Sequence, residues 1–192
     1  MTTKTQYLVL KDSMSKSSMH ALAKSNPWFL SEKVDRDPDN DIPFELIWET
    51  VDEQTSIHYI EDELVKFPYV VVKGKDVDKV VSKIRSKLDI YSDEELVQMF
   101  ESASQRNEKM KAVARLGVAS PQQFDSRFFN LLQQAFSDPD PEVRRTAVWC
   151  IGYASWAEFR EVLEQIVASD PDESVREDAA YMLESYKQHN IG

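Results

Sequence analysis

Apolar and polar side chains alternate along several short segments in the first half of the chain, a pattern typical of half-buried β-strands. The clearest segment is 44–50, FELIWET, and residues 55–60 continue the pattern after a polar stretch, so these two are expected to form a β-hairpin. Shorter β-type runs lie at 7–10 and at 69–73, where YVVVK is closed by Gly74. The sequence therefore predicts a small sheet.

Two segments beside these strands have helical features. Residues 17–25 have helical composition and are stopped by Asn26–Pro27, because proline cannot continue a helix. Asp76 can cap a second helix. Its apolar positions share one face: Val77, Val80, Val81, Ile84 and Leu88. With a polar, proline-containing loop at 35–43, the predicted order is β-α-β-β-β-α. This order describes a small α+β domain over residues 1–90, in which a helix covers one face of an antiparallel or mixed sheet.

From residue 92 onward the alternation disappears, and a helical pattern repeats along the chain. Residues 137–153, SDPDPEVRRTAVWCIGY, are echoed 32 positions later by SDPDESVREDAAYMLES at 169–185. A repeat of this length indicates stacked structural units, each of which buries its apolar face against its neighbours. The pattern predicts two helical hairpins, 126–136 with 141–154 and 157–168 with 173–187.

A more divergent hairpin is predicted ahead of these two. Ser92 and Glu95 form a capping-box pattern that begins a helix, and a second helix is expected at 108–118. Residues 91–192 are therefore predicted to form an all-α solenoid of about three hairpins.

The turn of this first hairpin differs from the later ones. At an offset of 35 residues, Ala103 stands where the next repeat has Asp138, and Lys109 stands where it has Arg144. We therefore expect the chemistry of the first turn to have drifted.

The two later repeats share a turn aspartate, a valine–arginine pair and a small residue on the following turn, and in this they resemble HEAT repeats, in the short form named after phycobilisome lyases. The resemblance implies that turn aspartates and arginines form a ladder along the stack: Asp138, Arg144, Asp170 and Arg176. It also implies a set of inward, buried positions: Val143, Ala147, Ile151, Val175, Ala179 and Leu183.

The composition fits an ordered globular protein, since 42% of the 192 residues are apolar, enough for one sizeable core or two small ones. No apolar run approaches the length of a membrane span. The first ten residues lack a signal-peptide pattern, and a single cysteine, Cys150, cannot form an internal disulfide and is expected in the core. These features predict a cytoplasmic location.

The formal net charge of −11 is unevenly distributed. Residues 1–90 hold 13 Lys and Arg against 16 Asp and Glu, whereas residues 91–192 hold 10 against 18. Because nucleic acid is bound through its phosphates, an acidic repeat region disfavours it as a ligand. The expected partner is another protein, with no nucleic acid and no membrane span.

Catalytic and metal-binding patterns are missing from the sequence. The three histidines lie in separate segments without ligand spacing, and four glycines are too few for a phosphate-binding loop. The acidic residues at 35–41 lack the glycine and glutamate that a calcium loop requires at fixed positions, so we interpret them as a solvated loop. We therefore expect no enzymatic activity, no cofactor and no metal site.

A basic stripe recurs every four residues at Lys79, Lys83 and Lys87, opposite the valines of the helix that follows Asp76. One interpretation is a solvated helix face. The other is a docking stripe for an acidic partner protein, or for the acidic second half of this chain.

Trp149 and Tyr181 occupy the same position of the two later repeats, outside the inward row. Stacked hairpins should place Trp149 beside Tyr181 and Arg145 beside Glu177. Aromatic and arginine side chains are the usual anchors of protein interfaces. We therefore predict a partner-binding row with Trp149 as its main anchor: Arg145, Trp149, Tyr153, Glu177 and Tyr181. Alternatively, Trp149 packs against the N-terminal domain or the next hairpin.

These patterns favour a non-catalytic adaptor or assembly factor, with the α+β domain covering the N-terminal end of the stack. The resemblance to the phycobilisome-lyase type implies an alternative, because several such proteins attach, remove or handle bilins, or act in assembly and turnover of light-harvesting complexes with a partner subunit. Nucleic-acid binding through the lysine stripe is a third, weaker hypothesis.

Overall fold

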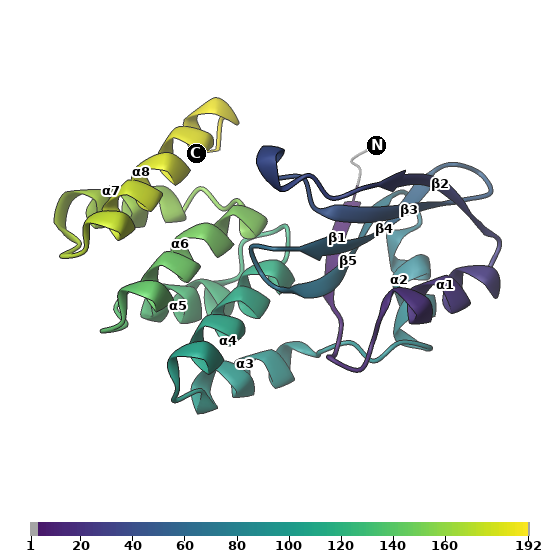
Figure 1. Cartoon of the computed structure of the whole chain (residues 1–192), viewed down its shortest axis with the longest axis horizontal. Helices are drawn as coiled ribbons and strands as arrows, with labels where there is room; N and C mark the ends of the chain where they lie inside the picture. The colour runs from purple at the N-terminus through teal and green to yellow at the C-terminus, as the bar shows by residue number, and fades with distance from the viewer. Residues whose placement is uncertain (1–3, 192) are drawn as a thin grey trace. The chain divides into compact units, whose positions relative to one another are not determined.

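The computed structural model describes residues 4–191, and the chain divides into two compact units between Tyr91 and Ser92 (Figure 1). The first unit combines a sheet with two α-helices, and the second consists of helices. This is the α+β fold with helical repeats that the sequence predicts. Within residues 4–191, no helix has the length and apolar character needed to cross a membrane.

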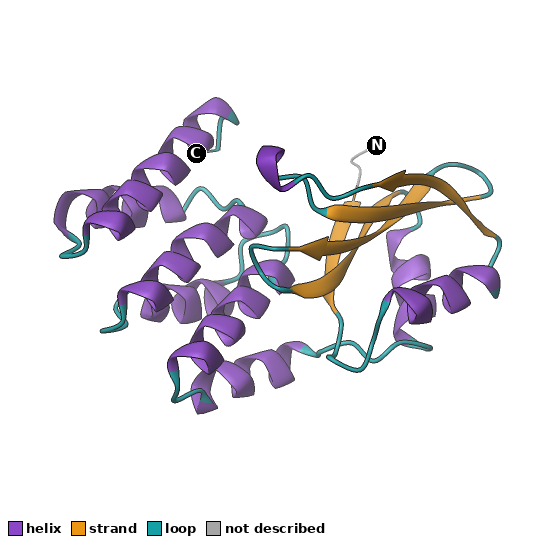
Figure 2. Cartoon of the chain, viewed as in Figure 1, coloured by secondary structure: helices purple, strands orange, loops and turns teal. Residues whose placement is uncertain are grey.

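The first unit is built on a five-stranded antiparallel sheet with the strand order β1-β5-β4-β3-β2 (Figure 2). Its strands are β1 Lys4–Val9, β2 Trp28–Val34, β3 Phe44–Thr50, β4 Thr55–Asp62 and β5 Phe67–Gly74. The predicted hairpin is formed by β3 and β4. Gly74 ends β5 with a φ of 142°, and a Cβ atom there would lie 2.1 Å from the carbonyl oxygen of Gln54, so a side chain cannot be accommodated.

Two helices pack on one face of this sheet and form a single core with it. They are α1 Lys16–Lys24 and α2 Val77–Arg85. Successive strands present matching positions to this core, because register places Trp48 opposite Ile57 and Ile57 opposite Val72. The apolar positions predicted for the second helix are all buried. Period-2 patterning in the strands and 3.6-residue patterning in α2 therefore meet in one apolar layer.

The predicted order of this unit is wrong by one strand, because β2 was not recognised in the hydrophobic pattern. Its sequence, WFLSEKV, does not alternate, and most of its side chains are exposed. It lies at the edge of the sheet and pairs only with β3, with a register irregularity between Leu30 and Glu32. An edge strand with little burial carries a weak sequence signal. The predicted loop at 35–43 contains a short 3₁₀ turn, Pro38–Asn40.

The second unit contains six helices in the part that the structure describes, arranged as three hairpins. The first hairpin is α3 Asp93–Ser102 with α4 Arg106–Ala119, the second is α5 Ser126–Ala135 with α6 Pro141–Ala154, and the third is α7 Phe159–Ser169 with α8 Glu173–Gln188. The second helices of the hairpins pack in succession, α4 against α6 and α6 against α8. The capping box between Ser92 and Glu95 is confirmed, with bonds of 3.2 and 2.8 Å.

The inward positions of the hairpins are buried as predicted, with one exception. Val143, Ala147, Ile151, Val175 and Ala179 are at most 1% exposed. Leu183, however, is only half-buried, and Met182 and Tyr186 complete the core of α8 instead. Ile151 lies on α6, which packs between α4 and α8, whereas α8 packs against α7 of its own hairpin and against α6 and has no further hairpin beyond it within the described residues.

A close approach between α4 and α6 depends on a glycine. A Cβ atom on Gly117 would lie 2.5 Å from the Cβ of Cys150 and 2.7 Å from its carbonyl oxygen. Cys150 itself is 1% exposed, which confirms it as a core residue. The equivalent glycine of α6, Gly152, is less constrained, because a Cβ atom there would come no closer than 3.5 Å to its nearest neighbour, Met182.

Candidate functional site

The turns of the second and third hairpins share the sequence Ser-Asp-Pro-Asp and a similar set of hydrogen bonds. The first aspartate of each turn accepts from the amide of the second, Asp138 from Asp140 and Asp170 from Asp172, both at 2.9 Å. The second aspartate caps the following helix: Asp140 accepts from the amide of Glu142 at 3.0 Å, and Asp172 from that of Val175 at 3.2 Å. The turns therefore have a fixed shape that orients their carboxylates.

Arg144 links these two turns across the hairpins. Its Nε and Nη2 donate to the two carboxylate oxygens of Asp170, each at 2.8 Å, and its Nη1 donates to the carbonyl oxygen of Asp138 at 2.9 Å. The side chains of Arg144 and Asp170 are only 8% and 6% exposed. This paired geometry is the rigid, bidentate form of an ion pair.

The first hairpin takes part in the same ladder despite its altered turn. Lys109 Nζ lies 2.7 Å from a carboxylate oxygen of Asp138 in the second hairpin. The first turn therefore differs from the later ones only in part. Ala103 removes the turn carboxylate, but Lys109 still forms an ion pair with an aspartate of the next hairpin, as the arginine at the equivalent position does. In the third hairpin, Arg176 Nη1 donates to the carbonyl oxygen of Asp170 at 2.6 Å.

The ladder changes the acidity of its members. Burial alone would raise the pKa of Asp170, but hydrogen bonds from Arg144 and from the amide of Asp172 outweigh it, so the pKa lies below its usual range. The hydrogen bond to Asp170 raises the pKa of Arg144 above its usual value, against the opposing effect of burial. Both groups are therefore held in their charged forms.

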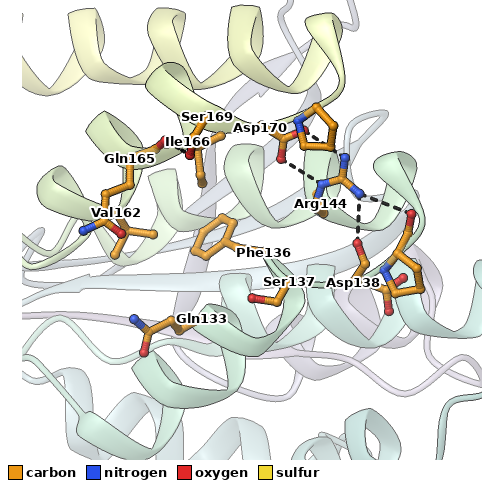
Figure 3. Close-up of a pocket in the computed structure, with 12 residues that line it drawn as sticks. Gln133, Phe136, Ser137, Asp138, Arg144, Val162, Gln165, Ile166, Ser169 and Asp170 are labelled. Carbon is orange, nitrogen blue, oxygen red and sulfur yellow. Dashed lines mark hydrogen bonds and ion pairs between the residues drawn. The ribbon is translucent and has the colours of Figure 1, made fainter.

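A cavity of about 530 Å³ lies beside this ladder, between the second and third hairpins (Figure 3). Neutral polar and apolar side chains from both hairpins line it: Gln133, Phe136, Ser137, Gln165, Ile166 and Ser169. The two glutamines are 32 positions apart, as are the two serines, so the repeat places equivalent groups on opposite sides of the cavity. A smaller cavity of about 280 Å³ lies between the first and second hairpins, next to Lys109. Side-chain amides can both donate to and accept from a peptide backbone.

The residues of the predicted partner-binding row come from α6 and α8. The rings of Trp149 and Tyr181 lie side by side, with centroids 5.4 Å apart and an interplanar angle of 45°. Tyr181 is 66% exposed, whereas Trp149 and Tyr153 are half-buried. The pairing of the two aromatic residues therefore agrees with the expectation from the repeat, and it agrees equally with the alternative that Trp149 packs against the next hairpin.

The expected pairing of Arg145 with Glu177 is wrong. Arg145 Nε instead donates to Asp178 at 2.7 Å, with a longer contact of 3.4 Å to Glu142. The hydrogen bond to Asp178 raises the pKa of Arg145. Asp178 is one residue further along α8 and points toward α6, while Glu177 is exposed. A rotation of 100° per residue separates the two carboxylates, and only one faces the neighbouring helix.

The lysine stripe lies on and just beyond α2. Lys79 and Lys87 are exposed and Lys83 is half-buried. The helix ends at Arg85, so Lys87 lies in the following turn, where its amide bonds the carbonyl of Ile84 at 3.1 Å. The stripe stays a prediction as a docking surface.

One arrangement of potentially reactive groups was not predicted from the sequence. On the sheet, His58 Nδ1 lies 2.6 Å from Glu45 and its Nε2 lies 2.8 Å from the hydroxyl of Ser56. A nucleophilic mechanism also needs unpaired N–H groups to hold an oxyanion. This requirement is not met by the backbone around Ser56, because β4 is an inner strand that pairs with β3 on one side and β5 on the other. The signal for this cluster is cross-strand pairing, which is invisible before the register is known. Within residues 4–191, no group of three or more potential metal ligands comes together.

Comparison with known protein families matches residues 94–189 to HEAT repeats. No curated protein and no solved structure matches the chain.

Proposed function

We propose that this chain, which belongs to the HEAT-repeat family, is a non-catalytic adaptor or assembly factor that binds another protein through its helical repeats. HEAT repeats commonly mediate protein–protein interaction. Stacked hairpins present an extended surface and need no catalytic group for this role. The acidic repeat region, with 18 Asp and Glu against 10 Lys and Arg over residues 91–192, favours a protein partner over nucleic acid.

The observation that carries the proposal is the aromatic pair of Trp149 and Tyr181. Two large rings lie 5.4 Å apart on neighbouring helices, and Tyr181 leaves 66% of its surface exposed. Exposed aromatic side chains that the core does not need are typical anchors of protein interfaces. We therefore assign partner binding to the row predicted from the sequence, with Arg145 acting through its ion pair with Asp178 to fix the edge of α8.

The test compares Trp149→Ala with the wild-type chain. We expect its partner to be bound about 2 kcal/mol more weakly, the usual size of an anchor loss. The melting temperature should change little, because Trp149 lies outside the inward row. Capture from native lysate with quantitative mass spectrometry identifies the candidates, and titration of the recovered partner gives the affinity. Leu64→Ala, at an exposed apolar site of the first unit, is the matched control and should bind normally. A large loss of stability with unchanged affinity per folded molecule would show that Trp149 is structural.

The resemblance to the phycobilisome-lyase type supports a second candidate, the handling of bilins or the assembly and turnover of light-harvesting complexes with a partner subunit. The repeated Ser-Asp-Pro-Asp turn with its valine and arginine is the feature behind it. Because Cys150 is 1% exposed, a bilin would have to bind without attachment to this chain's cysteine. A change in visible absorbance on mixing with a bilin is the expected result, and an unchanged spectrum at saturating bilin would remove this candidate.

A further inference from the structure

The last arginine of the ladder within residues 4–191, Arg176, has no carboxylate partner. Lys109 and Arg144 each hold an aspartate of the next hairpin, Asp138 and Asp170. Arg176 makes the equivalent bond to its own turn, the carbonyl of Asp170, but no carboxylate of residues 4–191 lies within ion-pairing distance of it. Its Nε and Nη2 therefore have no hydrogen-bond or ion-pair partner among the described residues.

The face of α6 that contacts α8 has an equivalent on α8 itself, 32 residues further along the chain, and we call this the outer face of α8. Arg145 and Trp149 of α6 contact Asp178 and Tyr181, and a Cβ atom on Gly152 would lie 3.5 Å from Met182. At an offset of 32 residues, the equivalent outward positions on α8 are exposed: Glu177, Tyr181 and Glu184. This face of α8 is therefore exposed, whereas the corresponding face of α6 is covered by α8.

The charges along this face are self-complementary in the antiparallel direction. Residues 173, 176, 180, 184 and 187 form one stripe, because steps of three and four residues stay on one side of a helix. When two copies of α8 cross at Ala180, Arg176 of one lies opposite Glu184 of the other, and Glu173 lies opposite Lys187. Ala180 is exposed and small, so two helix backbones can approach at this point.

We propose that a second copy of this chain occupies the outer face of α8, related by a two-fold axis at Ala180, with Glu184 of each copy filling the vacant ladder position at Arg176 of the other. Within one copy, Glu184 makes two long contacts, one of 3.7 Å with Lys187 and one of 3.5 Å with Gln188 Nε2, and the side chains of Glu184 and Lys187 are both 59% exposed. Exchanging this contact for a bidentate pair with an arginine is favourable. The two charges that carry this contact, Arg176 and Glu184, lie outside the partner-binding row, although Glu177 and Tyr181 of that row lie on the same outer face of α8.

A two-fold arrangement fits better than head-to-tail stacking. In a head-to-tail contact, the first hairpin of the next copy would present its turn to Arg176, and that turn carries Ala103 in place of the aspartate. Such a contact would leave Arg176 without a carboxylate, and it would continue into a ring or an open filament and would not close at two copies. The two-fold contact fills both arginines and closes at two copies.

The contact is expected to be weak. A single pair of crossing helices buries less surface than a stable interface, and its ion pairs are exposed to solvent. Glu177 lies beside the stripe and gains no cation in this register, which further limits the affinity. The dimer should therefore appear as the concentration rises, and it should weaken with added salt.

Sedimentation equilibrium of the full chain over a concentration series tests the proposal. The wild-type chain should show a monomer–dimer equilibrium. Glu184→Arg should weaken dimerisation at least about tenfold, because two-fold symmetry repeats each altered pair in the interface. Since position 184 is exposed, circular dichroism should show an intact fold. Arg176→Glu should act similarly. Combining the two substitutions restores opposite charges across the axis and should return the dissociation constant to within about threefold of wild type.

Two controls separate this contact from a general charge effect. Lys24→Glu, on an exposed position of α1, makes the same kind of charge change and should leave dimerisation unaltered. Trp149→Ala should also leave it unaltered, so a failure of the proposed partner site is distinguishable from a failure of this inference. A chain that stays monomeric up to about 1 mM, or a double variant that dimerises no better than the single ones, would overturn the proposal.

Discussion

Arg144 and Arg145 are neighbours in the sequence, and both pair with an aspartate of the third hairpin, yet their surroundings differ. The pair of Arg144 with Asp170 is bidentate, with side chains 8% and 6% exposed. The pair of Arg145 with Asp178 is held through one nitrogen, with the arginine 36% exposed. The pair of Arg144 with Asp170 lies at the turns between hairpins, which we call the turn edge. The pair of Arg145 with Asp178 lies beside Trp149 and Tyr181, which we call the aromatic edge.

The contribution of an ion pair to the free energy of unfolding therefore depends on its burial. A buried charge that loses its partner must remain unsolvated, which costs several kcal/mol, whereas an exposed charge regains water. We therefore regard the turn edge as the part that holds the hairpins in register, and the aromatic edge as the part free to serve binding.

The largest expected effect is that of Asp170→Asn. Loss of this carboxylate leaves Arg144 charged and buried, so the free energy of unfolding should fall by about 3 kcal/mol. Denaturant titration of the full chain measures it. Asp178→Asn is the matched substitution at the aromatic edge, and it should cost less than about 1 kcal/mol. Equal losses at the two positions would contradict the division into structural and surface edges.

Lowering the pH should reduce the difference in the free energy of unfolding between the wild-type chain and Asp170→Asn. The pKa of Asp170 is lowered in the folded state, so the ionised carboxylate binds protons less readily there than in the unfolded chain. Its stabilisation is therefore fully present above the unfolded pKa, about 3.9, and is lost as the pH falls through the folded pKa. Unfolding measured at neutral pH and at successively lower pH values should show the two proteins converging. A constant difference would mean that the ion pair does not contribute through its charge.

A smaller effect is expected at the first ladder position. Lys109 is 32% exposed and contacts Asp138 through a single nitrogen, so Lys109→Met should lower the free energy of unfolding by about 1 kcal/mol. Lys24→Met, at an exposed position of α1, provides a control for the substitution itself. A loss as large as that of Asp170→Asn would show that the ladder positions are equivalent in spite of their different burial.

The smallest effect is expected for Arg145→Met. Its ion pair is partly exposed, so stability should change by no more than about 0.5 kcal/mol. Partner affinity should nevertheless fall, because Asp178 and the edge of α8 lose their fixed position beside Tyr181. Thermal melts and partner titration give the two quantities separately, and a destabilised protein with normal affinity would place Arg145 with the turn edge instead.

Much of the fold was predictable because its signals are local. The capping box at Ser92, the period of the hairpins and the apolar face of α2 each depend on residues close together in the chain. β2 was missed because it lies at a sheet edge, where exposure removes the alternation that marks a buried strand. Leu183 was expected in the core because its repeat partner Ile151 is buried, but position in the stack, not position in the repeat, decides how many neighbours a residue has.

Helical periodicity and turn chemistry, both local in the sequence, predicted the number of hairpins, their turns and all of the inward side chains except Leu183. Only the tertiary structure decided which carboxylate each arginine takes. Helices α6 and α8 pack with a rotation that sets Asp178, and not Glu177, against Arg145. The same packing buries the pair of Arg144 with Asp170. Choices of this kind depend on distances between residues far apart in the chain, and these distances become fixed only when the hairpins stack.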